Sequence, residues 1–328
     1  MERYVAKRKP RWSYLVAVIL ILLLASLRIK AESPEPCAIQ TRMTFYEEFA
    51  YASGVPWYHI AAIDQYERNI ATFRQGSAAE LSYDTISLRI DPEVWSGYAA
   101  PCPYEDDPMK INLFFGMGRD GDGDGIADIH NEQDVMYTMV NYLTTFDDFE
   151  KAIVAYYQDE DATRIILGIA QLFERHETID LGARAFPVST WHNYSYSNGY
   201  GAARGWGGRR AHEGIDIFAD YGTPVISTSY GVVEVMGWNE YGGYRIGIRD
   251  IYNTYQYYAH LQGFASDLEE GSLVEPGQVI GSVGATGYGK EGTNGKFPPH
   301  LHYGLYKFDG RREWAFNPYP YLQRWEQE

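Results

Sequence analysis

The sequence predicts a multidomain protein with α and β parts: an N-terminal transmembrane helix, an α-helical domain and an all-β C-terminal domain. Three observations support this division. Residues 1–36 contain a basic cluster followed by an uncharged apolar run, and residues 37–185 carry apolar residues at helical spacing. Residues 186–328 instead contain short β-rich segments between glycine turns. At 328 residues the chain has room for two domains with a core in each.

Residues 1–36 are predicted to form a membrane segment. Basic residues precede the uncharged run Trp12–Leu27, as in an uncleaved anchor with a cytoplasmic N-terminus or in a signal peptide. Sixteen helical residues reach about 24 Å, so Arg11 and Arg28 would have to extend to the lipid head groups of a bilayer core about 30 Å thick. Because no Ala-x-Ala cleavage site follows, we expect a single-pass cell-membrane anchor with an extracytoplasmic body. Secretion after cleavage is the alternative.

The charge distribution excludes some partners. The net charge is −16, and beyond residue 30 the chain has 21 basic against 43 acidic residues, which is −22. A body this acidic argues against nucleic acid as a partner. An exported body also places Cys37 and Cys102 in an oxidising compartment, where we expect them to pair; two unrelated buried thiols are the alternative.

The domain 37–185 is predicted to be helical. Its apolar residues recur at helical spacing in four segments, which are Met43–Ser53, His59–Arg74, Glu132–Thr145 and Lys151–Arg175.

An acidic loop in this domain has the spacing of an EF-hand-like calcium site. Oxygen ligands fall at positions 1, 3, 5, 7 and 9, supplied by Asp120, Asp122, Asp124, the Ile126 carbonyl and Asp128. Position 12, where a bidentate glutamate belongs, is Asn131. Clustered carboxylates repel one another without a cation, so calcium binding is predicted; a solvated Asp-Gly turn is the alternative.

The C-terminal domain, 186–328, carries four of the chain's eight histidines in three short motifs. These motifs are His212-Glu-Gly-Ile-Asp216, Tyr258-Ala-His260-Leu and His300-Leu-His302. On strands, alternate residues share a face, so His212 is expected beside Asp216, and His300 beside His302 with Leu301 turned to the core. The same alternation places Gln256, Tyr258 and His260 together on the floor of a groove. Two imidazoles and a carboxylate are the ligand set of a catalytic zinc site with one open position.

At these motifs the sequence resembles the lysostaphin-type zinc metallopeptidases, which cut peptides of bacterial peptidoglycan. That family's signature is H-x-x-x-D, an isolated H-L, and H-x-H, and all three occur here in order. The resemblance implies that His212, Asp216 and His302 bind zinc and that His260 and His300 are uncoordinated catalytic histidines. It also implies peptidoglycan stem or cross-bridge peptides as the substrate.

The arrangement of anchor, helical domain and C-terminal peptidase resembles the sporulation-specific branch of that family, which cuts L-Ala–D-Glu bonds in spore cortex. A spore-envelope location is therefore an expectation as well. A catalytically inactive module that binds the wall or activates another enzyme is an alternative.

The segment Val55–Glu67 resembles the helix that bears the catalytic glutamate of lysozyme-like lytic transglycosylases. This resemblance implies a lysozyme-like helical domain with Glu67 as the candidate acid for glycan cleavage. Arg68 follows Glu67 where that family has serine, and a glycine-rich substrate segment is not visible. A bifunctional enzyme is therefore an alternative, and a structural Glu67 in a positioning domain is the simpler expectation.

Overall fold

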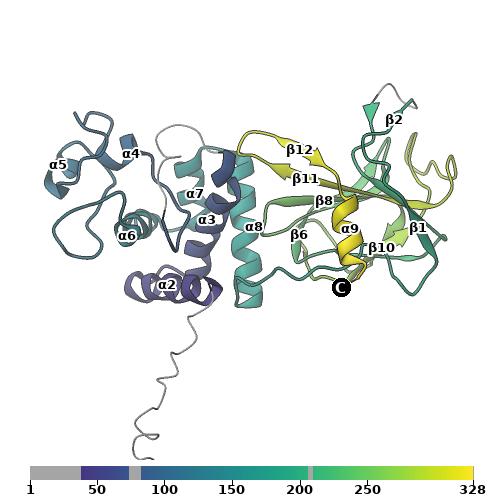
Figure 1. Ribbon diagram of the computed structural model, residues 1–328, viewed down its shortest axis with the longest axis horizontal. Helices are drawn as coiled ribbons and strands as arrows, with labels where there is room; N and C mark the ends of the chain where they lie inside the picture. Colours follow the sequence, from purple (N-terminus) through teal and green to yellow (C-terminus); the bar gives the residue numbers. More distant parts are fainter. Residues whose placement is uncertain (1–37, 74–82, 206–209, 328) are drawn as a thin grey trace, which may run out of the picture.

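The computed structural model describes residues 38–73, 83–205 and 210–327, which form a helical half and a β half lying next to each other (Figure 1). Within these ranges no helix is both long enough and apolar enough to cross a membrane. The predicted membrane segment 1–36 lies outside the described residues, so the anchor stays a prediction.

The helical half contains the four predicted helical segments and two short helices that the periodicity did not indicate. In chain order the elements are α2 (Ala38–Ser53), α3 (Trp57–Ile70), the 3₁₀ turn η1 (Ala71–Phe73), α4 (Pro92–Ser96), α5 (Pro108–Leu113), α6 (Glu132–Leu143), α7 (Phe149–Tyr157) and α8 (Glu160–His176). The short helices α4 and α5 each begin with Asp-Pro, in which the aspartate caps the helix and proline takes the first helical position.

The predicted helix over Lys151–Arg175 is in fact two helices. Gln158 ends α7 in the left-handed conformation, with φ of 50°. Asp159 then caps α8, because its carboxylate accepts a hydrogen bond of 2.7 Å from the backbone N–H of Ala162. The apolar periodicity continues across this break, which is why the pattern alone predicted one helix.

The β half is built on one antiparallel sheet with the path β1-β4-β11-β8-β7-β6-β9, to which β10 and β12 add at β8 and β11, and β5 at β10. The strands are β1 (Tyr194–Tyr196), β4 (Ile215–Ala219), β5 (Pro224–Ile226), β6 (Gly231–Asn239), β7 (Gly243–Arg249), β8 (Thr254–Phe264), β9 (Leu273–Val274), β10 (Val279–Val283), β11 (His300–Phe308) and β12 (Glu313–Phe316). A separate ribbon is formed by β2 (Ala203–Arg204) and β3 (Arg210–Ala211), and α9 (Tyr319–Trp325) follows the last strand. The predicted all-β core is thus confirmed.

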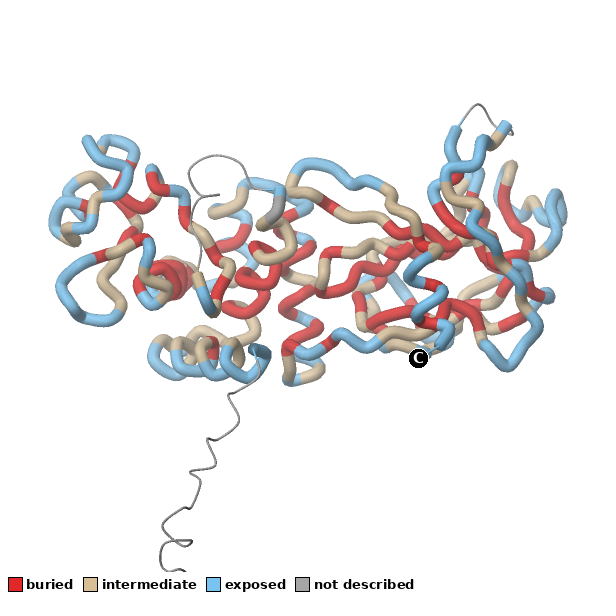
Figure 2. Tube along the Cα trace, in the orientation of Figure 1, coloured by how far each residue is buried: buried red, intermediate tan, exposed pale blue. Residues whose placement is uncertain are grey.

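Each half has its own buried core (Figure 2). In the β half, alternate residues of neighbouring strands point inward, as Ile215, Ile217, Leu301 and Tyr303 do, all fully buried. The inward direction of Leu301 was predicted, and it leaves the flanking histidines on the opposite face.

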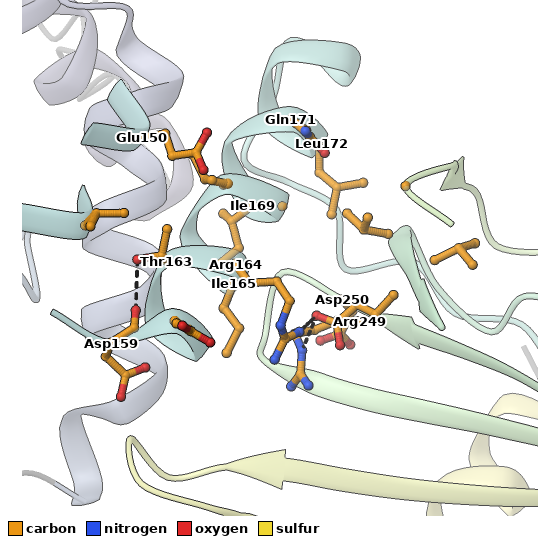
Figure 3. Close-up of a pocket in the computed structure, with 18 of the residues that line it drawn as sticks. Glu150, Asp159, Thr163, Arg164, Ile165, Ile169, Gln171, Leu172, Arg249 and Asp250 are labelled. Atoms are coloured by element: carbon orange, nitrogen blue, oxygen red, sulfur yellow. Dashed lines mark hydrogen bonds and ion pairs between the residues drawn. The ribbon is translucent and has the colours of Figure 1, made fainter. Parts of the chain in front are cut away.

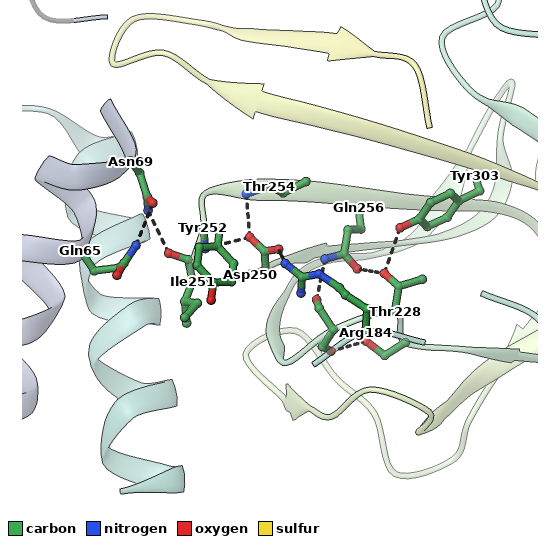
Figure 4. A network of polar contacts seen from close by, with 12 residues as sticks. Gln65, Asn69, Arg184, Thr228, Asp250, Ile251, Tyr252, Thr254, Gln256 and Tyr303 are labelled. Atoms are coloured by element: carbon green, nitrogen blue, oxygen red, sulfur yellow. Dashed lines mark hydrogen bonds and ion pairs between the residues drawn. The ribbon is translucent and has the colours of Figure 1, made fainter. Parts of the chain in front are cut away.

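Two turns of the β half enter the core of the helical half. Ile251, between β7 and β8, and Phe308, at the end of β11, are both buried among the helices. Asn69 of α3 donates a hydrogen bond of 2.8 Å to the Ile251 carbonyl (Figure 4). The backbone around Ile251 is held in turn by Asp250, which forms an ion pair of 2.8 Å with Arg184. The sheet and the helices are therefore in direct apolar contact through Ile251 and Phe308.

A cavity of about 760 Å³ lies beside this contact, between α7–α8 and strands β6 and β7 (Figure 3). Apolar side chains of α8 such as Ile165 and Leu172 line one wall. Arg164, Arg249 and Glu234 form a chain of ion pairs across it. Its described lining residues include no histidine, so this cavity is separate from the residues predicted to be catalytic.

Candidate metal centre and peptidase site

Three predicted ligands converge on one point. His212 Nε2 lies 3.0 Å from His302 Nδ1 and 3.1 Å from Asp216 Oδ1, and His302 Nδ1 lies 3.0 Å from the same oxygen. The three atoms therefore form a nearly equilateral triangle. Groups of two imidazoles and one carboxylate at such separations can hold a divalent metal ion.

Strand register brings these ligands together from two distant motifs. On the adjacent strands β4 and β11, Asp216 and His302 are direct partners. His212 does not belong to the strand, contrary to the expected alternation, because it lies in the connection between β3 and β4. Gly214 in this connection makes room for the site, since a Cβ atom there would come within 2.6 Å of the His302 ring.

Backbone carbonyls fix the orientation of the histidine rings. His212 Nδ1 lies 3.0 Å from the Gly199 carbonyl oxygen, so Nδ1 carries the proton and Nε2 faces the triangle with its lone pair. In the same way His260 Nδ1 lies 2.8 Å from the Thr286 carbonyl, and His300 Nδ1 lies 2.7 Å from that of Pro298. In both of these rings Nε2 is therefore the nitrogen that is left to exchange a proton.

His260 and His300 lie beside the predicted metal ligands without being part of the triangle. Their ring centroids are 4.7 Å apart, and His300 Nε2 is 3.9 Å from Asp216 Oδ1. Both rings are mostly buried, at 5% and 6% exposure. The structure thus brings all five predicted residues together, and two of the four imidazoles remain to act on protons.

The predicted groove floor of Gln256, Tyr258 and His260 is wrong in two of its three members. Gln256 and Tyr258 are buried, and both hydrogen-bond with Thr228 on the core side of the sheet. His260 has a φ of +63°, and the β7–β8 register shifts at this position. This bulge reverses the alternation, so His260 faces the cavity together with Tyr257 and Ala259.

The site holds its carboxylate ionised and two of its imidazoles neutral. Burial alone would raise the pKa of Asp216, but its close contacts with the His212 and His302 rings outweigh burial and hold this pKa far below its usual range. Burial lowers the pKa of His260 to about 3, and the neighbouring imidazoles lower it further. Burial also lowers the pKa of His302. Neutral imidazoles and an ionised carboxylate are the forms that bind metal ions.

His212, His260 and His302 line a cavity of about 160 Å³. Sequence reasoning missed most of its wall, which consists of aromatic and charged side chains: Arg204, Arg210, Glu213, Tyr241, Tyr257, Tyr288 and Tyr306. Arg204 forms an ion pair with the second oxygen of Asp216, so it supports a predicted metal ligand from outside. A signal that could have found part of this wall is the abundance of glycine, tyrosine and arginine in residues 194–210, directly before His212.

Comparison with known proteins identifies the fold and chemistry of this site. Residues 210–318 match Peptidase family M23. The chain is also 48% identical over 316 residues to the L-Ala–D-Glu endopeptidase of Bacillus subtilis, covering 95% of this chain and 96% of that protein. The chain belongs to peptidase family M23. It is accordingly a metalloendopeptidase that acts on peptidoglycan, as the signature of its histidine motifs predicted.

The similarity to lysostaphin covers a smaller part of the chain. Lysostaphin from Staphylococcus simulans is 33% identical over 133 residues, covering 40% of this chain and 25% of lysostaphin. The solved catalytic domain of lysostaphin from the same organism is 32% identical, covers 42% of this chain and 98% of that domain, and has a TM-score of 0.33.

Glu67 of this M23 peptidase lies in the helical half, away from the cavity onto which the histidines open. It is 1% exposed, and its carboxylate accepts a hydrogen bond of 2.7 Å from the Tyr157 hydroxyl. Arg68 points elsewhere and pairs with Asp64 at 3.2 Å. These contacts favour the structural role, and the resemblance to lytic transglycosylases stays a prediction.

The acidic loop is ordered by its own hydrogen bonds. Asp120 accepts from the backbone N–H groups of Gly123 and Gly125, at 2.7 and 2.9 Å. The carboxylates that could share an ion are those of Asp120, Asp122 and the buried Asp134. The predicted set included Asp124, Ile126 and Asp128 in place of Asp134. Calcium binding stays a prediction.

The predicted disulfide is not tested. Cys102 is exposed and has no disulfide partner among the described residues, and its predicted partner Cys37 lies outside them.

Proposed function

We propose that this M23 peptidase is a zinc-dependent endopeptidase that hydrolyses the L-Ala–D-Glu bond of peptidoglycan stem peptides. The observation that carries the proposal is the triangle of potential ligand atoms from His212, Asp216 and His302, with two further imidazoles beside it. The bond is inferred from the B. subtilis relative, whose similarity extends over both halves of the chain.

Zinc fits the donor set. A tetrahedral ion with bonds of about 2.0–2.1 Å separates its ligand atoms by about 3.3 Å, close to the 3.0–3.1 Å edges of the triangle. Two imidazole nitrogens and one carboxylate oxygen also leave a fourth position open, as a catalytic site requires. When bound, zinc supplies an acidified water molecule and polarises the scissile carbonyl group.

The two remaining histidines would move the protons. His260 is neutral, with Nε2 as an acceptor, so it is suited to accept the proton of the attacking water. His300 Nε2 lies on the same face, where it can hydrogen-bond to the developing oxyanion or pass a proton to the leaving amine. Hydrolysis yields a free alanine carboxylate and a new glutamate amino group.

The remaining assignments are proposals of lower rank. We infer that the body acts outside the cytoplasm, held by the anchor 1–36 or secreted, and that its role belongs to sporulation. Glycan cleavage through Glu67 gains no support from that residue's burial. A module that only binds the wall gains no support either, because each ligand position of the family signature carries a residue that can bind a metal ion. Calcium at Asp120 and Asp122 would stabilise the helical half without taking part in chemistry.

Mass spectrometry of peptidoglycan fragments tests the proposal directly. Digestion of purified walls by the zinc-loaded protein should release fragments with a new N-terminal glutamate, and Asp216→Ala should release none. New termini at another residue would replace the proposed bond. New anhydro or reducing sugar ends would establish a glycan enzyme, and an unchanged digest would indicate a binding module.

A further inference from the structure

Arg210 is a cation on the wall of the catalytic cavity without an acidic partner among the described residues. It pairs across the β2–β3 ribbon with Arg204, and both arginines line the cavity that contains His212, His260 and His302. Arg204 is neutralised by its ion pair with Asp216. The positive charge of Arg210 is not balanced in this way.

The neighbours of Arg210 orient its guanidinium without consuming its hydrogen-bond donors. The guanidinium carbon lies 4.7 Å from the centre of the Tyr241 ring. Stacking on a ring occupies the flat face of a guanidinium and leaves its N–H edges free to bind a carboxylate with two hydrogen bonds. Glu213 also lines the cavity, but it forms no ion pair with Arg210.

Placing two arginines opposite each other in a ribbon of two residue pairs is unfavourable, because like charges directly across a pair of strands repel. An anion beside Arg210 would remove this repulsion. The body of the protein is strongly acidic, so an unbalanced cation in its catalytic cavity favours an anionic ligand over a neutral one.

The proposed substrate brings such an anion to this position. In an L-Ala–D-Glu bond the glutamate contributes its amino group, and at most one of its two carboxyl groups continues the chain. The other carboxylate belongs to the residue directly after the scissile bond. It therefore enters the cavity together with the reacting amide and loses water there, which is costly without a cationic partner.

We propose that Arg210 binds the free carboxylate of the glutamyl residue that follows the scissile bond, and thereby selects this substrate. The inference rests on the proposed function, because it requires glutamate at that position. Arg210 is thus a specificity determinant that contacts the substrate, in addition to the metal ligands and the two histidines.

The test compares two synthetic peptides that both contain L-Ala–D-Glu, one with the free glutamyl carboxylate and one with a carboxamide in its place. The wild-type protein should cleave the carboxylate peptide with a kcat/KM about 10- to 100-fold higher, the usual worth of a charge-assisted bidentate pair. Arg210→Gln should lose most of this preference by losing activity on the carboxylate peptide alone. The preference of Arg210→Lys for the carboxylate peptide should lie between those of the wild type and Arg210→Gln, since lysine keeps the charge but not the bidentate guanidinium.

Two controls separate a structural effect from recognition. Arg311→Gln removes an exposed arginine of the β11–β12 turn and should leave the preference unchanged. The zinc content of Arg210→Gln, measured by metal analysis, should equal that of the wild type.

Equal losses on both peptides in Arg210→Gln, or a preserved preference, would overturn the assignment. If the wild type cleaves both peptides equally, the bond assignment stands and Arg210 selects nothing. If it cleaves neither, the proposed bond is wrong and the inference fails with it.

Discussion

Two mostly buried carboxylates, one in each half of the molecule, show why the β half holds the peptidase site. Asp216 lies within 3.1 Å of two imidazoles and pairs with Arg204. Both imidazoles and Arg204 line a cavity whose wall carries aromatic and charged side chains. Glu67 lies among apolar helices and accepts a hydrogen bond from Tyr157. Both positions were singled out by sequence resemblance. Other potential ligand atoms surround Asp216 next to an accessible cavity, whereas Glu67 is enclosed in the helical core. This difference favours a functional role for Asp216 and a structural role for Glu67.

We expect the largest difference between the two halves when each of these acids is replaced in turn. Asp216→Ala should lose bound zinc and reduce peptidase activity by more than about 10⁴-fold, because the metal and its activated water are lost together. Glu67→Gln should leave wall digestion unchanged. Metal analysis and muropeptide release measure both results. Full zinc occupancy in Asp216→Ala would refute the ligand assignment, and loss of sugar-end products in Glu67→Gln would establish a second active site.

The next effect separates ligands from acid–base groups within the β half. His260→Ala and His300→Ala should each keep stoichiometric zinc while kcat falls by about 10²–10⁴-fold, the usual contribution of a positioned proton-transfer group. His302→Ala serves as the matched control, since it should lose the metal. Zinc loss in His260→Ala would mean that the ligand and catalytic roles are exchanged.

The contact between the halves can be tested at Ile251, which is 1% exposed and packs among the helices although it belongs to the β half. Ile251→Ala should lower the free energy of unfolding by about 2–5 kcal/mol, through the lost apolar burial and the cavity left behind. Chemical denaturation followed by the fluorescence of both halves measures this change. An effect below about 0.5 kcal/mol would show that the two cores are not coupled through this turn.

A smaller effect is expected from the residue that supports Asp216. Arg204→Gln should weaken zinc binding by about 10- to 100-fold, the usual effect of removing an outer partner of a metal ligand. Competition with a chelator measures the affinity, and Arg311→Gln provides the control. Unchanged affinity would mean that the ion pair with Asp216 does not persist in the metal-bound protein.

The smallest effect concerns acid stability of the helical half. Burial lowers the pKa of His59 from 6.5 to about 4, although Glu174 and Asp148 oppose this shift, and its ring stacks on Phe149. The folded state therefore favours neutral His59, so this stabilisation is complete above pH 6.5 and is lost as the pH falls towards 4. His59→Gln should lose less stability than the wild type between pH 7 and pH 4.5 in thermal melts. The exposed His130→Gln should behave like the wild type; identical acid sensitivity in both variants would exclude His59 as the cause.

From the sequence alone the β-rich C-terminal domain and the peptidase family could be predicted, and five residues could be named as candidates for the site, because motif spacing and strand periodicity are local properties. His300-Leu-His302 is one such pattern, and the structure places Leu301 in the core and both histidines on the cavity side. Local patterns also predicted four helical segments, but missed the break at Gln158, where a single left-handed residue and the cap Asp159 end the regular spacing.

Which side chains surround the predicted metal ligands depends on how distant segments of the chain pack together. The bulge at His260 depends on how β8 pairs with β7, and it moves Gln256 and Tyr258 from the predicted groove to the core. Arg204 and Arg210 meet the cavity because the β2–β3 ribbon folds over a site built from other strands. The burial of Glu67 is another example. The sequence indicates that this carboxylate lies on a helix, but it does not show which residues pack over it. Long-range pairing and packing are properties of the assembled chain, and no local spacing encodes them.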